Sequence, residues 1–322
     1  MVVVAMTARR ILITGAAGFT GLHACRKFAA SGWEVVAALS PRGANTSGLE
    51  AALTERCELT DAEAVAEMMK RLEPDAVLHL AGRNAVDVSW TSPASTLAAN
   101  LMSTAYLLEG ARAIGGCRVL VAGSMLRASE AALSEAPHPY GFSKTLQTAA
   151  AKAWHRWYGL PVMIAEPSNL IGPGNSAGLC GKIVRWAVSA EQPEGKTKAP
   201  PFRLSSLHES RDFMDVRDAV AAYELVLNEG EPGRSYAIES GRFRTLAEVK
   251  SAFDDLAQAE LPWEIGEGTA ALAPTPQPRD CSPILELGWK PVLTFRQSIF
   301  DALQDERERR SRERGDAPFD SP

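Results

Sequence analysis

Short apolar runs alternate with amphipathic segments along the first half of the chain. Such runs, bounded by polar or turn residues, predict buried strands, and apolar residues at i, i+3 and i+4 predict helices that bury one face. The strands expected are Arg10–Thr14, Glu34–Leu39, a short strand ending before Cys57, Ala76–Leu80, Arg118–Gly123 and Pro161–Ala165. The helices expected between them are Gly21–Ser31, Asp61–Leu72, Pro93–Ile114 and Tyr140–Tyr158. Strands that alternate with helices predict a parallel sheet covered on both faces, a Rossmann-like doubly wound α/β fold.

The pattern changes after Pro167. Pro, Gly and Ser gather in three stretches, at Gly172–Gly178, Pro193–Pro201 and Ala273–Pro283. We therefore expect a nucleotide-binding domain over residues 8–166 and a smaller, mainly substrate-binding lobe over 167–304, interleaved with the last strands of the sheet. From Asp305 the chain is rich in Glu and Arg, which predicts a helix end that frays into a charged, disordered tail over 305–322.

Composition and charge narrow the class of protein. The 322 residues are 46% hydrophobic and 23% charged, which is ordinary for a globular protein in water. The net charge of −5 argues against a nucleic-acid binder, which needs clustered Lys and Arg. The opening apolar run, Met1–Met6, is too short to span a membrane. The five cysteines are scattered without a CxxC pair, so we expect reduced thiols in a cytoplasmic protein and no metal site.

A glycine-rich segment, TGAAGFTG at Thr14–Gly21, lies between the first strand and the first helix. Gly15 permits the tight turn, Gly18 lets the backbone approach the phosphates, and Gly21 lets the helix pack closely. The N-terminus of that helix then faces the pyrophosphate of a dinucleotide. In this strand–turn–helix setting a dinucleotide site is favoured over a glycine-rich turn without a ligand.

The end of the second strand bears on the choice of cofactor. NAD sites usually place an acid there, to accept hydrogen bonds from the ribose hydroxyl groups. This chain has Leu39 instead, so no carboxylate repels a 2′-phosphate, and Arg42 in the following loop is available to bind one. NADP(H) is therefore favoured, and NAD(H) remains the alternative. An ordinary surface arginine is the other interpretation of Arg42.

Two further segments are candidates for contacts with the cofactor. Glu58 and Leu59 follow the short third strand, where a carboxylate can meet the adenine amino group. The nearby Asp61 is better explained as a helix cap. Leu80–Gly82 closes the fourth strand with small residues that let the cofactor lie against the backbone. His79, just before them, is expected to be a core histidine because its strand is apolar.

Tyr140 and Lys144 lie one helical turn apart and so share a helix face. A free phenol loses its proton near pH ~10, which is too high for a proton carrier at neutral pH. A nearby ammonium, together with the positive ring of an oxidised nicotinamide, stabilises the phenolate, so we expect a lowered pKa for Tyr140. Tyr140 can then exchange a proton with a hydroxyl or carbonyl group while hydride passes at C4 of the nicotinamide. Ser124, after the fifth strand, is placed to hydrogen-bond the same oxygen, and Lys144 to bond the nicotinamide ribose.

These motifs and five longer segments resemble the extended short-chain dehydrogenase/reductase family (NAD-dependent epimerase/dehydratase) over about Arg9 to Leu303. Within it, they look most like the GDP-6-deoxy-4-keto-D-mannose reductases. The segments are AGRNAVDVSW at Ala81–Trp90, PYGFSK at Pro139–Lys144, PSNLIGPGN at Pro167–Asn175, ESRDFMDVRD at Glu209–Asp218 and LGWKP at Leu287–Pro291. The glycine loop and YxxxK are shared by the whole family, whereas PSNLIGPGN and SRDFMDVRD are more specific.

The resemblance implies roles for individual residues. Ser124, Tyr140 and Lys144 would form the catalytic triad, and Asn100 would support the lysine through backbone and water contacts. Asn169 and Arg211 would bind the nucleotide diphosphate of the substrate, to which a guanidinium fork is suited. With the residues argued above, the cofactor contacts expected are Gly15, Ala17, Gly18, Phe19, Thr20, Arg42, Glu58, Leu59, Leu80, Ala81, Gly82, Asn100, Tyr140, Lys144 and Pro167. The family also implies a homodimer formed by the helices Pro93–Ile114 and Tyr140–Tyr158, with Trp154 and Trp157 in the interface or in the core.

The chain departs from the family's pattern around the substrate pocket. Dehydratases carry an Asp-Glu pair after the active-site hydroxyl residue, and Met125 and Leu126 stand there instead, which argues against dehydration. Glu166 replaces an arginine, and Ser168 replaces a bulky aromatic residue. Ala128–Ser129 replaces an aromatic-glycine pair, and the loop that follows is short. The pocket is therefore expected to differ while the cofactor chemistry is retained.

We therefore expect an NADP(H)-dependent reductase that acts on the 4-keto group of a nucleotide-linked deoxysugar, with Tyr140 as the proton donor and no nucleic-acid or membrane partner. Three alternatives remain open. A nucleotide-sugar 4-epimerase would use the same triad and keep tightly bound NAD. A reductase of a non-nucleotide carbonyl compound would fit Glu166 and the short loop. A cofactor-binding regulator without turnover would fit the altered pocket.

Overall fold

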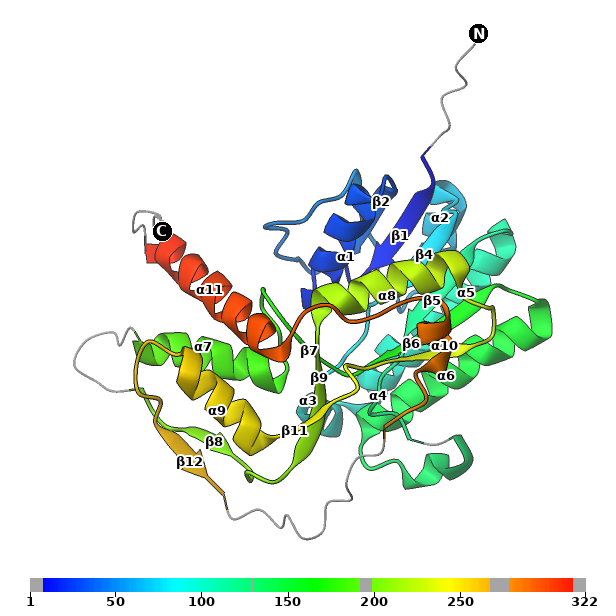
Figure 1. Ribbon diagram of the computed structural model, residues 1–322. Coiled ribbons are helices and arrows are strands. Elements are labelled where there is room, and N and C mark those ends of the chain that lie inside the picture. The colour runs from blue at the N-terminus through cyan, green and yellow to red at the C-terminus, as the bar shows by residue number, and fades with distance from the viewer. Residues whose placement is uncertain (1–7, 129, 192–198, 267–277, 315–322) are drawn as a thin grey trace. The chain divides into compact units, whose positions relative to one another are not determined.

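The structure, a computed structural model, describes residues 8–128, 130–191, 199–266 and 278–314 (Figure 1). The chain divides into two compact units. The first is made of the chain up to Pro167 together with Val220–Ile238 and Cys281–Trp289. The second is made of Ser168–Ala219, Glu239–Asp280 and the chain from Lys290 on. The chain thus leaves the first unit after Pro167 and returns to it twice.

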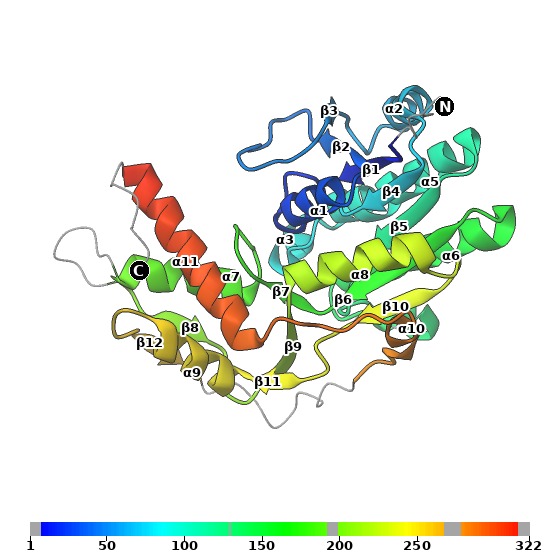
Figure 2. The same cartoon turned by 45° about the horizontal axis from the view of Figure 1, so that its top comes forward.

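The first unit is built on a seven-stranded parallel sheet with the order β10-β6-β5-β4-β1-β2-β3 (Figures 1 and 2). Its strands are β1 (Arg10–Thr14), β2 (Glu34–Leu39), β3 (Leu53–Arg56), β4 (Ala76–His79), β5 (Arg118–Ala122), β6 (Val162–Pro167) and β10 (Ser235–Ile238). Apolar runs such as Ile11–Ile13 are buried, because helices cover both faces. The order reverses between β1 and β4, and ligands of such sheets bind at the carboxyl ends beside that point. The predicted doubly wound α/β fold is confirmed.

Helices lie on both faces of this sheet. The longer ones are α1 (Phe19–Ala30), α2 (Ala62–Leu72), α5 (Ser103–Ile114), α6 (Pro139–Tyr158) and α8 (Val216–Glu229), and the shorter ones are α3 (Val86–Thr91), a 3-10 turn (Glu130–Glu135) and α10 (Ser282–Glu286). On one face, Met68 of α2, Leu108 of α5 and Ala151 of α6 belong to one core cluster with strand residues. On the other face lie α1 and α8 (Figure 2). Lys27 of α1 and Glu224 of α8 form an ion pair of 2.9 Å.

The helix predicted over Pro93–Ile114 is interrupted. α4 (Pro93–Leu97) passes into one turn of π-helix at Ala98–Met102 before α5 begins, with Asn100 at its centre. The hydroxyl group of Thr104 donates to the carbonyl oxygen of Asn100, four residues earlier, at 2.7 Å. Such side-chain bonds compete with the regular helical ladder, and π turns are frequent at functional sites. The apolar spacing carries no sign of this turn, because the residues that stabilise it are polar.

In its described residues, the second unit holds two small sheets and three longer helices. Its strands are β7 (Asn169–Ile171), β9 (Ser210–Asp215) and β11 (Phe243–Thr245) in one sheet, and β8 (Phe202–Leu204) and β12 (Trp263–Ile265) in the other. Its helices are α7 (Leu179–Glu191), α9 (Leu246–Leu256) and α11 (Phe295–Arg314). Ile183, Phe213, Phe253 and Leu303 lie in a core that joins all three helices to β9.

The C-terminal helix α11 corrects one prediction. The solvated tail expected over 305–322 is wrong as far as Arg314, because α11 continues to that residue and buries Glu306, Arg307 and Ser311. Residues 315–322 lie outside the described part of the chain.

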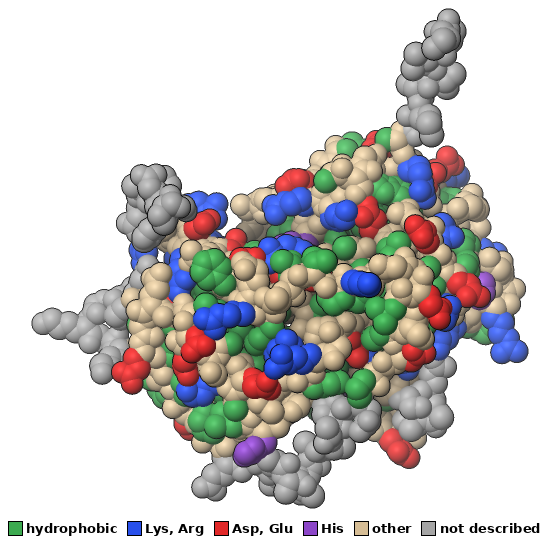
Figure 3. All heavy atoms as spheres, viewed as in Figure 1, with side chains coloured by type: hydrophobic (Ala, Val, Ile, Leu, Met, Phe, Trp, Pro, Cys, Tyr) green, Lys and Arg blue, Asp and Glu red, His purple; other side chains and the backbone are tan. Residues whose placement is uncertain are grey.

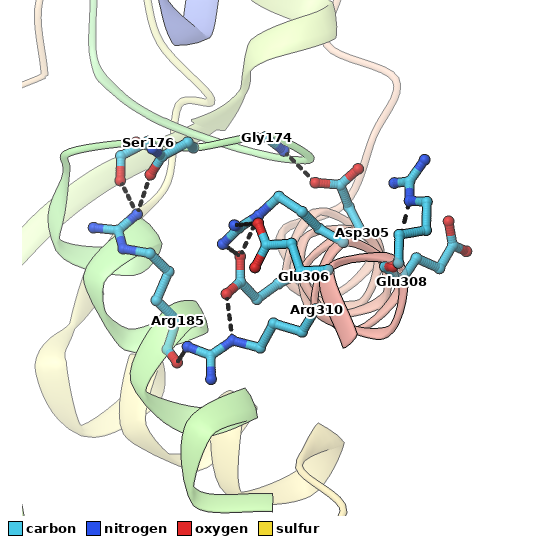
Figure 4. A network of polar contacts seen from close by, with 11 residues as sticks. Gly174, Ser176, Arg185, Asp305, Glu306, Glu308 and Arg310 are labelled. Atoms are coloured by element: carbon cyan, nitrogen blue, oxygen red, sulfur yellow. Dashed lines mark hydrogen bonds and ion pairs between the residues drawn. The ribbon is translucent and has the colours of Figure 1, made fainter. Parts of the chain in front are cut away.

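The charged side chains of α11 have partners within the same unit, as Figure 4 shows. Asp305 accepts a hydrogen bond from the backbone nitrogen of Gly174 at 2.9 Å. Arg310 donates to Glu306 at 2.8 Å and to the carbonyl oxygen of Arg185, on α7, at 3.0 Å. A run of Glu and Arg therefore remains helical here because its charges are paired, which composition alone does not reveal.

Figure 3 shows one face of the surface, on which Lys and Arg side chains are interspersed with Asp and Glu. Among the described residues, no helix is both long and apolar enough to cross a lipid bilayer. Those residues also contain no group of three or more His, Cys, Asp or Glu placed to hold a metal ion.

Candidate active site

Gly15, Gly18 and Gly21 shape the turn between β1 and α1. Gly15 has a φ of +68°, and a Cβ there would lie 2.8 Å from the backbone nitrogen of Ala81. A Cβ on Gly21 would overlap the carbonyl oxygen of Gly15. Gly18 differs, since its φ of −79° suits any residue and its Cβ would meet that same oxygen at 3.1 Å. The turn itself therefore requires Gly15 and Gly21, whereas at Gly18 neither the backbone conformation nor an overlap requires a glycine.

The first turn of α1 is left open to an anion. Gly18 is its N-cap, no side chain caps it, and the turn carries no acidic residue. The first backbone N–H groups and the positive end of the helix dipole are thus available to a phosphate. Ala17, Phe19 and Thr20 flank this end and are partly exposed. The residues present fit a dinucleotide pyrophosphate, in agreement with the sequence pattern.

Two guanidinium groups lie at the carboxyl end of β2. Arg42, in the following loop, is exposed and forms an ion pair of 3.6 Å with Glu58. Arg56 ends β3 in register with Leu39 and donates to the carbonyl oxygen of Ser40 at 3.1 Å. Arg56 was not among the predicted cofactor contacts, although its place at the end of the strand beside β2 makes it a candidate.

The two carboxylates on the loop between β3 and α2 have different hydrogen-bond partners. Glu58 accepts a hydrogen bond from the Thr60 hydroxyl at 2.7 Å, and this bond lowers its pKa. Asp61 accepts from the backbone nitrogens of Glu63 and Ala64 at 3.0 and 3.1 Å, which confirms it as the cap of α2. Leu59 is partly buried between them.

The segment Leu80–Gly82 lies close to Asn100 and to Lys144 of α6 at Gly82. A Cβ on Gly82 would lie 2.6 Å from Oδ1 of Asn100 and 4.0 Å from Nζ of Lys144. Asn100 accepts from the backbone nitrogen of Arg83 at 2.7 Å and donates to the Ser143 hydroxyl, on α6, at 2.8 Å. Asn100 therefore holds the chain after β4 against α6, and in the described part of the chain no hydrogen bond joins it directly to Lys144.

Helix α6 places the predicted phenol and ammonium. It begins where His138 accepts a hydrogen bond from the backbone nitrogen of Gly141 at 2.8 Å, and Pro139 occupies the first helical turn, where its missing N–H is not needed. Tyr140 is buried and hydrogen-bonded to Ser124. The structure thus brings together the predicted phenol and the predicted strand-end hydroxyl.

The expected lowering of the pKa of Tyr140 is wrong for the chain on its own. Burial raises this pKa, because the phenolate would lose its hydration, and the hydrogen bond from Ser124 opposes the rise only in part. The prediction rested on the charges of Lys144 and of an oxidised nicotinamide, and the desolvation of the phenolate outweighs the effect of the protein's own groups. A neutral phenol is therefore the resting form at neutral pH.

Lys144 is buried one helical turn after Tyr140. Its Nζ donates to the carbonyl oxygen of Ala122 and to Oε1 of Gln147, both at 2.8 Å. Burial lowers the pKa of Lys144 to about 8, so the ammonium still prevails at neutral pH. Gln147 was not predicted, although its position three residues after Lys144 places it on the same helix face.

His79 is confirmed as a core histidine. It is fully buried, which lowers its pKa to about 3, and its ring nitrogens contact the hydroxyl groups of Thr14 and Thr104 at 2.7 and 2.9 Å.

Glu166 and Pro167 end β6 beside the Ser124 loop. The buried carboxylate of Glu166 forms an ion pair of 2.5 Å with Arg127, and Pro167 accepts from the backbone nitrogen of Met125 at 3.2 Å. The acid that departs from the family's pattern is thus balanced by a base on the neighbouring loop.

The two residues expected to bind a diphosphate lie in the second unit and have partners there. Asn169 donates to the carbonyl oxygen of Asp212 at 2.8 Å. Nε and Nη2 of Arg211 both donate to Oε1 of Glu209, at 2.8 and 2.5 Å. Ser168 is buried, and no described group bonds its hydroxyl.

Comparison with known proteins identifies the family. A model of the NAD dependent epimerase/dehydratase family matches residues 11–238. The chain belongs to this family. One curated relative, GDP-6-deoxy-D-mannose reductase of Pseudomonas aeruginosa, is 30% identical to this chain over 92% of the chain and 97% of the relative. The dTDP-glucose 4,6-dehydratase of Haemophilus influenzae is 27% identical over 90% and 95%.

Solved structures agree with the epimerase/dehydratase assignment. RMD from Pseudomonas aeruginosa, complexed with NADPH, superposes with a TM-score of 0.76 at 28% identity, covering 94% of this chain and all of that one. UDP-glucose 4-epimerase from Thermotoga maritima, with UDP-glucose, gives a TM-score of 0.80 at 20% identity over 93% and 99%, which shows the shared fold. The chain is therefore an NAD(P)-dependent oxidoreductase of the extended short-chain dehydrogenase/reductase type.

Proposed function

We propose that this chain is an NADP(H)-dependent reductase of the 4-keto group of a nucleotide-linked deoxysugar, resembling GDP-4-keto-6-deoxymannose. The observation that carries the proposal is the buried Tyr140, bonded to Ser124 and followed one turn later by Lys144. Met125 and Leu126 stand where a dehydratase has its acid pair, and the Pseudomonas relative is named as a reductase.

Ser124, Tyr140 and Lys144 have distinct tasks in the proposed reaction. When bound, the nicotinamide would supply hydride to the carbonyl carbon. Ser124 and Tyr140 would donate hydrogen bonds to the carbonyl oxygen, and Tyr140 would give up its proton as negative charge develops there. The raised pKa means that Tyr140 holds its proton before the reaction, so loss of that proton would depend on the negative charge that develops on the carbonyl oxygen and on the nearby ammonium of Lys144. Lys144 would bind the nicotinamide ribose and limit the cost of the phenolate left behind.

The preference for NADP(H) rests on Arg42 and Arg56. Both are near the carboxyl end of β2, which carries Leu39 in place of an acid, and two guanidinium groups suit a 2′-phosphate. Arg56→Ala should therefore weaken binding of NADPH and leave binding of NADH nearly unchanged.

A reductase of a non-nucleotide carbonyl compound is the second candidate. Arg211, proposed to bind the diphosphate, is already paired with Glu209, which favours a substrate without that group. Arg211→Ala distinguishes the two candidates: KM for a keto-sugar nucleotide should rise strongly if Arg211 binds the diphosphate, and should stay the same for a simple ketone.

The first experiment is calorimetric titration with NADPH and NADH, each with and without GDP, UDP, dTDP and CDP. Tight NADPH binding joined by binding of one nucleotide would support the nucleotide-sugar reductase and direct the choice of keto-sugar. Purified protein that already carries NAD would point to a 4-epimerase instead. Turnover lost in Tyr140→Phe with cofactor binding retained would exclude a cofactor-binding regulator.

We also propose a homodimer formed through α5 and α6. Trp157, on α6, is 63% exposed and contacts the ring of Trp154, which supplies apolar area to such an interface. Trp157→Lys should shift the protein to a monomer in sedimentation experiments, and an unchanged dimer would contradict this.

A further inference from the structure

A line of hydrogen bonds runs through the interior of the first unit, and it starts at the cofactor turn. The backbone nitrogen of Ala81 donates to the hydroxyl of Thr14 at 3.1 Å, and that hydroxyl contacts Nδ1 of His79 at 2.7 Å. Nε2 of His79 contacts the hydroxyl of Thr104 at 2.9 Å. All three side chains are buried.

The line continues through Gln147 to the catalytic helix. Nε2 of Gln147 donates to the Thr104 hydroxyl at 2.8 Å, and its Oε1 accepts from Nζ of Lys144 at 2.8 Å. Gln147 is fully buried, so both of its polar atoms depend on these partners.

The direction of each bond follows from the number of protons available. The hydroxyl of Thr104 has one proton and donates it in a hydrogen bond to the carbonyl oxygen of Asn100. The same hydroxyl oxygen therefore accepts from both His79 and Gln147. Neutral His79 therefore carries its proton on Nε2 and accepts at Nδ1 from Thr14. With its amide NH₂ committed to Thr104, Gln147 must face Lys144 with its carbonyl oxygen.

Gln147 offers the buried ammonium an acceptor that has no charge. The other acceptor is the carbonyl oxygen of Ala122, and in the described part of the chain no ion pair joins Lys144 to a carboxylate. Among the described residues, the neutral His79 of β4 interacts electrostatically with the ammonium, and Tyr140 lies one turn earlier on the same face of α6. A carboxylate at 147 would neutralise Lys144, and an apolar side chain would leave one of its N–H groups unsatisfied.

We propose that Gln147 is the positioning residue for Lys144, which it holds beside Gly82 while leaving the full positive charge available to Tyr140 and the cofactor. The inference rests on the role proposed above for Lys144. It adds that this role needs a neutral acceptor at 147, tied through Thr104 and His79 to the turn that binds the cofactor.

The test compares two substitutions of similar size with a matched control. Gln147→Glu keeps the acceptor and adds a charge, and Gln147→Met removes the acceptor. Thr148→Val is the control, because Thr148 is the next residue of α6, is equally buried, and its hydroxyl has no partner among the described residues. Thermal unfolding establishes that each variant is folded.

The first readout needs neither cofactor nor substrate. Lysines labelled with ¹³C at Cε are titrated by NMR, and Lys144→Met assigns the signal of Lys144. Gln147→Glu should raise the pKa of Lys144 by at least about one, Gln147→Met should lower it, and Thr148→Val should leave it unchanged. The same pKa in all folded variants would overturn the proposal.

The second readout is steady-state turnover of a carbonyl substrate. Gln147→Met should lower kcat roughly tenfold or more with little change in KM, because the misplaced ammonium affects the transition state. Gln147→Glu should move the alkaline limb of the kcat profile to higher pH, since a neutralised Lys144 no longer favours the phenolate. Unchanged kcat and pH profiles in both variants would overturn the proposal. Absence of any turnover by the unsubstituted protein would overturn the proposed function instead, while the NMR titration would still decide the position of Lys144.

Discussion

Lys144 couples the stability of the fold to pH, and one substitution isolates this coupling. Burial lowers the pKa of Lys144 from 10.5 to about 8 in the folded chain. The unfolded chain therefore binds a proton at this site more readily than the folded chain does. The free energy of unfolding is lowered by the full effect below about pH 8 and recovers as the pH rises toward 10.5. The difference in pKa corresponds to roughly 3 kcal/mol, of which about 2.5 kcal/mol should return between about pH 7 and pH 10.

The assay is urea unfolding of the unsubstituted protein and of Lys144→Met at a series of pH values. Both proteins share every other titrating group, so the difference between their free energies of unfolding isolates Lys144. Between about pH 7 and pH 10, the free energy of unfolding of the unsubstituted protein should rise by roughly 2.5 kcal/mol relative to that of Lys144→Met. If the free energies of unfolding of the two proteins change with pH in parallel, the reasoning is refuted, because folding then does not desolvate the ammonium.

Three further predictions concern the glycine turn, α11 and the thiols. Gly18→Ala should fold normally, because among the described residues its Cβ comes close only to the carbonyl oxygen of Gly15, at 3.1 Å. It should bind NADPH at least roughly tenfold more weakly in calorimetry, because a glycine at this place in the motif lets the backbone approach the phosphates. Gly21→Ala should instead lower the melting temperature, since its Cβ overlaps backbone oxygen atoms. Arg307→Met should lower the free energy of unfolding, measured in urea, by roughly 3 kcal/mol, because the buried carboxylate of Glu191 loses its partner at 2.6 Å. A decrease below about 1 kcal/mol, the size expected for an exposed ion pair, would contradict this. In the native protein a disulfide reagent should react fastest with Cys281, which is partly exposed while the other four thiols are buried, and Cys281→Ser should remove that reaction.

The parts of the fold that depend on local pattern could be predicted from the sequence. The strands Arg10–Thr14 and Glu34–Leu39 were predicted with the bounds that the structure shows, because short apolar runs between turn residues leave few alternatives. The glycine turn was likewise identifiable, since the strand, the glycines and the helix follow one another directly.

Features that depend on partners distant in the sequence could not be predicted. The charged end of α11 is ordered because Asp305 bonds the loop at Gly174, 131 residues earlier. The pKa of Tyr140 depends on how deeply folding buries it, and the YxxxK spacing does not contain that information. Gln147 is adjacent to the motif, but its importance follows only from the hydroxyl of Thr104, which lies 43 residues away.

The position of β10 in the sheet bears on how the protein is made. β10 pairs with β6, yet the chain between them, from Ser168 to Ala219, belongs to the second unit. During synthesis from the N-terminus, the apolar strand β6 is complete while its outer neighbour is still missing, so its backbone N–H and C=O groups form an unpaired edge. Such edges promote association between nascent chains. The yield of folded protein would therefore depend on how soon β10 pairs with β6, or on a chaperone that covers β6 until then. A fragment ending at Pro167, which lacks β10, should aggregate.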